Sequence, residues 1–195
     1  MVLSNEKIRQ AIQEGIIEID PLPDLNDPAV FNKIFDTTAL NLTLGEILSV
    51  PKKTLSINFD VTQGGIVQTL RTVYEREKIP SNGYILKPSN FILAHTREHI
   101  SLNIIEDKPC YAARVEGKSS LARCGLMIHF TAPTIHAGFS GTITLELINF
   151  GAYPITLHAG MPICQLIFES VDGKIAYKES KFQDQITPEG NKLKC

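Results

Sequence analysis

Short apolar runs separated by turn residues dominate the chain from about Thr38 onward, and this pattern most constrains the fold. Residues 39–44 alternate apolar and polar side chains before Gly45, as expected for a strand with one buried face. The dipeptides Asn82-Gly83 and Asp172-Gly173 are typical of two-residue hairpin turns. Further strands are predicted at Tyr84–Leu86, Phe91–Thr96, Ala112–Val115, Leu126–Thr131, Thr142–Asn149 and Pro162–Phe168. Many short strands indicate an all-β sandwich or barrel-like fold.

The two ends of the chain depart from this β pattern. Ser4 is a typical helix N-cap and Gly15 a typical stop. The apolar face of that helix is predicted to be Ile8, Ala11 and Ile12. Three prolines within residues 16–32 exclude a continuous helix or a central strand there, so a loop is predicted. We therefore expect one domain over residues 1–195, with a helical and loop segment at 1–35, a β core at 36–180 and a mobile tail at 181–195.

Charge and cysteine content narrow the class of protein. Nineteen basic and 21 acidic side chains give a net charge of −2, so nothing attracts the whole chain to nucleic acid or an acidic membrane. No apolar run reaches the length of a transmembrane helix, and the N-terminus lacks a secretory pattern. The cysteines, which form no Cys-x-x-Cys pair, are Cys110, Cys124, Cys164 and Cys195. Reduced thiols in a cytoplasmic protein are the expectation.

Residues 95–99, His-Thr-Arg-Glu-His, match the pattern of one group of zinc peptidases. That chemistry requires a helix, because only a spacing of four residues on a helix brings both imidazoles to one face. Here the alternation of Phe91, Leu93 and His95 predicts a strand. On a strand His95 and His99 would lie about 13 Å apart. The favoured interpretation is a partly exposed strand with polar side chains, and not a zinc site.

Residues 115–126, Val-Glu-Gly-Lys-Ser-Ser-Leu-Ala-Arg-Cys-Gly-Leu, form the first stretch that suggests chemistry. Gly117 offers a turn after a strand, and Ser119 can begin a short helix that places Arg123 on the same face. Backbone N–H groups, two hydroxyls and a guanidinium would then converge as a phosphate cradle. An ordinary serine helix cap accounts for the same residues.

The second stretch is residues 138–149, Gly-Phe-Ser-Gly-Thr-Ile-Thr-Leu-Glu-Leu-Ile-Asn. On a strand, Thr142, Thr144 and Glu146 would share one face, and the aliphatic residues between them the other. Glu146 is then either a carboxylate on the solvent-exposed face of the strand or a general acid/base held in a pocket.

Together these stretches closely resemble the dCTP deaminase branch of the dUTPase superfamily. The family pattern Gly-Arg-Ser-Ser-Leu-Ala-Arg-x-Gly-Leu corresponds to residues 117–126, and Leu-Glu-x-x-Asn to residues 145–149. Between them, Thr131-Ala132 and Gly138-Phe139-Ser140-Gly141 match in order and spacing. Further matches are residues 159–166 and 180–185, so the resemblance covers most of the chain.

The resemblance implies a distorted β-barrel or jelly-roll-like subunit in a homotrimer, with active sites between subunits. It implies zinc-independent deamination of dCTP to dUTP and ammonia, with Glu146 as general base. Ser119 and Arg123 are implied to hold the water and the carboxylate, and Lys118 and Ser120 to contact the phosphates. The remaining implied nucleotide-binding residues are Arg123, Ala132, His136, Gln165, Tyr177, Lys181 and Gln185. A Mg²⁺ ion is expected on the triphosphate, with no protein side chain as its ligand.

Three positions depart from the family pattern. Lys118 stands where Arg is usual, which keeps the charge but loses the bidentate fork. His136 and Asn41 stand where Asp is usual, and both changes argue against hydrolysis of dUTP. His136 is alternatively a surface histidine without a role. The alternatives to a dCTP deaminase are a bifunctional deaminase/dUTPase or a dUTPase releasing pyrophosphate, a non-enzymatic nucleotide-binding paralogue, and an enzyme for another cytidine nucleotide.

Overall fold

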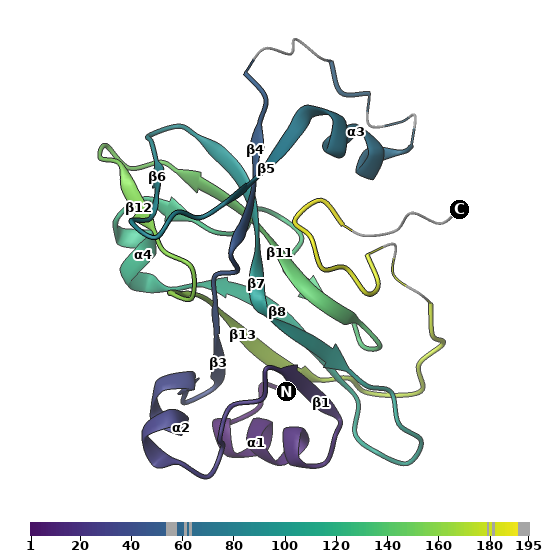
Figure 1. The fold of residues 1–195 in the computed structure, drawn as a ribbon. Coiled ribbons are helices and arrows are strands. Elements are labelled where there is room, and N and C mark those ends of the chain that lie inside the picture. The colour runs from purple at the N-terminus through teal and green to yellow at the C-terminus, as the bar shows by residue number, and fades with distance from the viewer. Residues whose placement is uncertain (54–57, 61, 63, 179, 181, 191–195) are drawn as a thin grey trace.

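The structure, a computed structural model, describes residues 1–53, 58–60, 62, 64–178, 180 and 182–190 (Figure 1). Strands make up 40% and helices 16% of the described residues, so the prediction of a mainly β fold is confirmed. The helices are α1 (Asn5–Gln13), α2 (Pro28–Ile34), α3 (Ile66–Val73) and α4 (Ser119–Arg123). The strands are β1 (Ile17–Asp20), β2 (Phe35–Asp36), β3 (Ala39–Thr43), β4 (Ile47–Pro51), β5 (Tyr74–Lys78), β6 (Tyr84–Leu86), β7 (Phe91–Leu102), β8 (Tyr111–Gly117), β9 (Leu126–Met127), β10 (Thr134–Ile135), β11 (Ser140–Asn149), β12 (Ile155–Leu157) and β13 (Pro162–Ser170).

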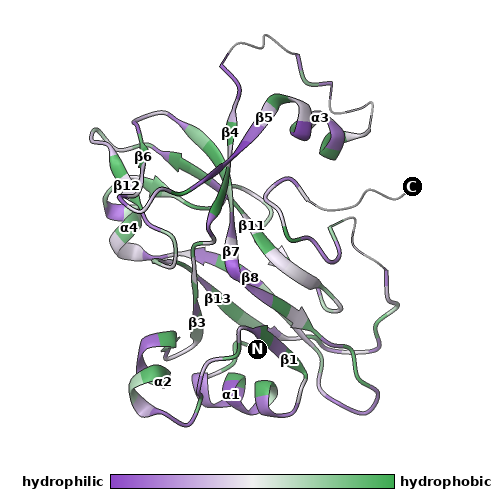
Figure 2. Ribbon diagram, viewed as in Figure 1, coloured by the Kyte–Doolittle hydropathy of each residue, from purple (hydrophilic) through white to green (hydrophobic). Residues whose placement is uncertain are grey.

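Two sheets pack over one core. The six-stranded sheet has the order β5-β4-β7-β11-β9, with β1 also pairing with β7, and the five-stranded sheet has the order β10-β8-β13-β3-β2. One hydrophobic cluster joins side chains of both sheets, and apolar residues follow their strands in Figure 2. Within the described residues the strand pairing does not close into a barrel. None of the described helices is long and apolar enough to cross a bilayer.

The N-terminal helix forms as its sequence predicts. The Ser4 hydroxyl accepts a hydrogen bond from the Lys7 backbone N–H, which caps α1. The helix buries Ile8, Ala11 and Ile12. Helices α1 and α2 lie at one end of the molecule and α3 at the opposite end (Figure 1).

The predicted loop over residues 16–32 is wrong, because it contains β1 and the start of α2. In β1 the isoleucines are buried and the acidic residues exposed, and the strand pairs antiparallel with the end of β7. Pro28 lies in the first turn of α2, where its missing N–H would have had no helical partner. Asp27 caps that helix by accepting a hydrogen bond from the Ala29 N–H.

The two hairpin predictions are also wrong, although both glycines are in turns or bends. Gly83 has a φ of +91°, but the strands on either side of it belong to different sheets, and β6 pairs with β12. After Gly173 no strand begins among the described residues. A turn residue fixes only a local reversal, whereas the partner of a strand is decided by packing. The strand predicted at Leu126–Thr131 pairs only over β9, and the other predicted strands are present.

A bulge interrupts the central pair of strands, β7 and β11. Three residues of β7, Thr96 to Glu98, lie opposite the single residue Ile143 of β11. His95 and His99 therefore lie on one strand, on either side of the bulge. No three His, Cys, Asp or Glu side chains in the described part of the chain are grouped as metal ligands. The location of both histidines on β7 confirms the strand interpretation of the His-x-x-Glu-His sequence.

The segment predicted as a mobile tail packs against the domain where the structure describes it. Residues 182–190, here called the C-terminal strap, lie alongside the first half of β11 (Figure 1). The Gln185 carbonyl accepts hydrogen bonds from the N–H (2.8 Å) and hydroxyl (3.1 Å) of Thr142, and the Gln185 amide donates to the Thr142 carbonyl (2.7 Å). The strap thus covers one edge of the face that carries Glu146. Lys181 and residues 191–195 lie outside the described residues.

Candidate active site

Glu146 is held on β11 with its carboxylate outside the core. Its neighbours Leu145 and Leu147 are fully buried, so alternation turns Glu146 to the other face, as predicted. Its Oε2 atom accepts a 3.3 Å hydrogen bond from the Phe130 N–H and lies 3.2 Å from Nδ1 of His129. The Glu146 side chain is 31% exposed, so the carboxylate reaches solvent.

His129 is a member of this site that the sequence analysis did not identify. Strand β9 pairs with β11 through Met127 and Ile148, and extending that register by two residues places His129 opposite Glu146. The His129 side chain is only 14% exposed. The sequence offers little signal for His129, because Leu126, Met127 and Ile128 before it are all apolar, and only the structure shows that Leu126 and Ile128 are the buried ones.

A hollow of about 520 Å³ lies beside this pair. Its lining includes Gly117, Ala122, Met127, His129 and Phe130. The volume falls in the range of small-molecule sites. The hollow is therefore lined by part of the first stretch, residues 115–126, and by His129 and Phe130, which contact Glu146 of the second stretch.

Helix α4 presents its polar side chains to solvent. Ser119, Ser120 and Arg123 are all exposed, and Arg123 Nη1 donates to the Ser119 carbonyl at 3.4 Å. Ser119 and Arg123 therefore share a face, as predicted. Among the described residues no hydrogen bond joins α4 to Glu146.

Gly125 permits the tight return from α4 to β9. Its φ is +87°, and a Cβ atom there would lie 2.3 Å from the backbone nitrogen of Gly151. Only glycine satisfies both the conformation and the close approach of the two backbones. The position of α4 over the hollow depends on this contact.

Lys118 is directed at its own sheet. Its Nζ donates a 2.5 Å hydrogen bond to Oδ1 of Asn41 and lies 3.9 Å from the carboxylate of Asp36. Gln165, on β13, pairs in register with Asn41 of β3 and Glu116 of β8. Lys118, Asn41 and Gln165 thus form a second group, at the start of α4.

The remaining predicted residues lie in two further places. Ala132 and His136 are exposed on the segment between β9 and β11. Tyr177 is 55% exposed, and its ring covers Gly138, where a Cβ would lie 2.5 Å from it. Gln185 is buried against Thr142. The structure therefore gathers Tyr177 and Gln185 at the start of β11, apart from the Glu146 hollow.

These features define a class of protein. A mainly β chain carries a water-accessible carboxylate beside a hollow, next to a short helix bearing hydroxyls and a guanidinium. A family model described as dCTP deaminase-like matches residues 2–171. The chain belongs to the dCTP deaminase-like family, and the prediction that it is an enzyme of that family is confirmed.

Individual relatives agree along nearly the full chain. A Methanobrevibacter smithii protein named "dCTP deaminase, dUMP-forming" is 32% identical, over 99% of this chain and 95% of its own length. A Natronomonas pharaonis protein named "dCTP deaminase" is 31% identical over the same shares. The solved 2'-deoxycytidine 5'-triphosphate deaminase from Agrobacterium tumefaciens has a similar fold, with a TM-score of 0.61, 18% identity, and coverage of 86% of this chain and 47% of that chain.

Proposed function

We propose that this chain hydrolytically deaminates dCTP, with Glu146 as the general base and without zinc. The observation that carries the proposal is the Glu146 carboxylate, fixed through Oε2 and still open to solvent beside the hollow. The names of the two relatives support the substrate.

In the proposed reaction the carboxylate of Glu146 takes a proton from a water molecule. The water oxygen adds to C4 of cytosine across the C4–N3 double bond, and Glu146 delivers the proton to N3. Glu146 then takes the remaining hydroxyl proton and gives it to the amino group. The C4–N bond then breaks, ammonia leaves, and the added oxygen remains as the carbonyl of uracil. General acid/base catalysis of this kind contributes about 10²–10⁴-fold, or roughly 3–5.5 kcal/mol of the barrier. Positioning and electrostatic preorganisation supply the rest.

The other roles follow from the family resemblance. Ser119 and Arg123 would help to hold the water and the carboxylate, and Ser120 and Lys118 would contact phosphates. Because α4 is exposed and makes no hydrogen bond to Glu146 within the described residues, we propose that a complete site needs a second copy in a homotrimer. Mg²⁺ would bind with the triphosphate oxygens as its ligands. A cytoplasmic location stays a prediction.

The product of the proposed reaction is either dUTP or dUMP. We propose dUTP, because position 136 offers an exposed imidazole where hydrolysis of dUTP would call for a carboxylate. The second candidate, continued hydrolysis to dUMP and pyrophosphate, is favoured by the "dUMP-forming" name of the M. smithii relative.

The test is anion-exchange chromatography of dCTP incubated with the protein and Mg²⁺. Conversion to dUTP supports deamination alone, and conversion to dUMP supports the second candidate. Glu146→Gln should abolish turnover while dCTP still binds, whereas Glu106→Gln, at an exposed turn, should not change it. Unchanged dCTP with the wild-type protein, or full activity of Glu146→Gln, would contradict the proposal.

A further inference from the structure

The inference concerns His129 and rests on the proposed role of Glu146. Two donors converge on one oxygen of the Glu146 carboxylate, the Phe130 N–H at 3.3 Å and His129 Nδ1 at 3.2 Å. Neither of these contacts uses Oε1. We propose that His129 is a positioning residue, which holds Oε2 so that Oε1 is presented to the attacking water.

The chemistry of the two groups fixes the direction of the hydrogen bond. An ionised carboxylate only accepts hydrogen bonds, so Nδ1 of His129 must carry the proton that points to Glu146. This tautomer leaves the general base ionised and able to take a proton through its other oxygen. His129 thus acts through Glu146 and forms no bond to the reacting atoms.

The segment that carries His129 is itself fixed on both sides. Ile128 is buried in the core, and the Phe130 ring packs edge-on against Phe91 with centroids 5.7 Å apart. A few residues later, the Pro133 carbonyl accepts a hydrogen bond from the Val115 N–H. The donor at His129 is therefore held in place before substrate binds, whereas a free glutamate side chain would sample several rotamers.

Two amide variants separate positioning from other roles. In His129→Asn the side-chain NH₂ group falls near the place of Nδ1, and in His129→Gln it falls near the place of Nε2. We expect His129→Asn to keep most of the turnover, and His129→Gln and His129→Leu to lower kcat by about 10–100-fold, since misplacing a reacting group by about 1 Å costs about 10²-fold. KM for dCTP should change little in all three. His158→Leu, at an exposed turn, is the matched control and should leave kcat unchanged.

Each outcome decides one question. Equal kcat for the Asn and Gln variants, or wild-type kcat in His129→Leu, would overturn the positioning role. Should His129→Leu fail to fold, the Asn and Gln pair still gives the answer, because both carry the same amide group and differ by the one methylene that moves its N–H. Full activity of Glu146→Gln would instead overturn the proposed function. Loss of activity in Glu146→Gln together with normal turnover in His129→Leu would overturn this inference alone.

Discussion

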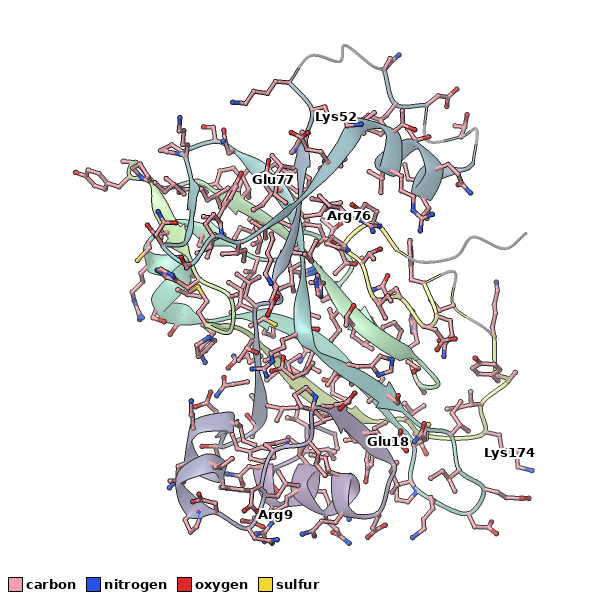
Figure 3. All side chains as sticks on the ribbon, viewed as in Figure 1. Arg9, Glu18, Lys52, Arg76, Glu77 and Lys174 are labelled. Atoms are coloured by element: carbon pink, nitrogen blue, oxygen red, sulfur yellow. The ribbon has the colours of Figure 1, made fainter. Side chains whose placement is uncertain are left out.

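The carboxylate of Glu189 lies 3.0 Å from Nη2 of Arg76, and the two side chains fasten the end of the C-terminal strap to β5. Nε of Arg76 donates to the same carboxylate, and the hydroxyl of Ser49 on β4 donates to it as well. Figure 3 labels Arg76 beside the strap. Glu189 is 2% exposed, so its charge is removed from water and depends on these donors.

Glu189→Ala should therefore release the strap. The change leaves the fully buried Ser49 hydroxyl without this acceptor and Arg76 without its ion pair. The free energy that favours the docked strap over the released one should fall by about 1–3 kcal/mol. Hydrogen exchange of the Thr142 amide, which is bonded to Gln185, should become faster by a corresponding factor. The control is Glu46→Ala, which breaks an exposed ion pair with Lys78 and should change little. Unchanged exchange in Glu189→Ala would show that the ion pair does not hold the strap.

The same contact predicts an acid-induced opening. Burial alone would raise the pKa of Glu189, but hydrogen bonds from Arg76 and Ser49 outweigh it and lower the pKa below its ordinary value of 4.5. A carboxyl with a lowered folded-state pKa stabilises the docked strap fully above pH 4.5. That stabilisation is lost as the pH falls below 4.5 and through the folded-state pKa. The NMR signal of Thr142 should report this opening, and Glu189→Gln should remove its pH dependence.

The Thr96 hydroxyl is expected to stabilise the β7 bulge. Its buried hydroxyl accepts a 2.9 Å hydrogen bond from the Ile143 N–H and donates to the Glu98 carbonyl at 2.8 Å. Thr96→Val keeps the shape but leaves the Ile143 N–H without an acceptor, so urea unfolding should show a loss of about 1–3 kcal/mol. Thr96→Ser keeps the hydroxyl and should lose only about 0.8 kcal/mol for the missing methyl. Equal losses in the two variants would contradict this account.

Two glycines with the same backbone angle separate strain from steric clash. Gly125 and Gly173 both have a φ of +87°, but a Cβ at Gly173 meets nothing within 4 Å, whereas at Gly125 it meets the Gly151 backbone. Gly173→Ala should cost about 1–2 kcal/mol for the left-handed conformation. Gly125→Ala should cost about 1–3 kcal/mol more in urea unfolding, because the Gly151 backbone must move. It should also lower turnover by shifting α4. Equal losses would show that the backbone contact is unimportant.

The parts predicted correctly depend on local pattern. The face of β11 that carries Glu146 follows from simple alternation, and the cap and buried face of α1 follow from residue spacing. The parts that were missed depend on partners distant in sequence. His129 becomes part of the site only through the pairing of β9 with β11. Glu189 is buried against Arg76 and Ser49, which both lie more than 110 residues away in the sequence. The contacts of the strap with β5 and β11 therefore could not be found from its own polar sequence.

The proposed trimer makes a prediction about mixed assemblies. If Arg123 of one copy completes a site that uses Glu146 of another, then Arg123→Ala and Glu146→Gln should each be inactive alone. In trimers refolded from an equal mixture of the two, about a quarter of the sites would combine an intact Arg123 with an intact Glu146. The exposed face of α4, without a hydrogen bond to Glu146 in the described chain, motivates this experiment.

The measurement is dCTP turnover of the mixture against each variant refolded alone. Activity near a quarter of wild type is expected, because about a quarter of the sites combine an intact Arg123 and an intact Glu146 from two different copies. No single chain in the mixture carries both functional residues. A mixture of Glu146→Gln with Glu146→Ala serves as control and should stay inactive, since no copy then supplies the carboxylate. An inactive Arg123→Ala and Glu146→Gln mixture, with trimers shown by sedimentation, would mean that each chain builds its site from its own α4. In that case the hollow beside His129 would have to admit the whole nucleotide within one subunit.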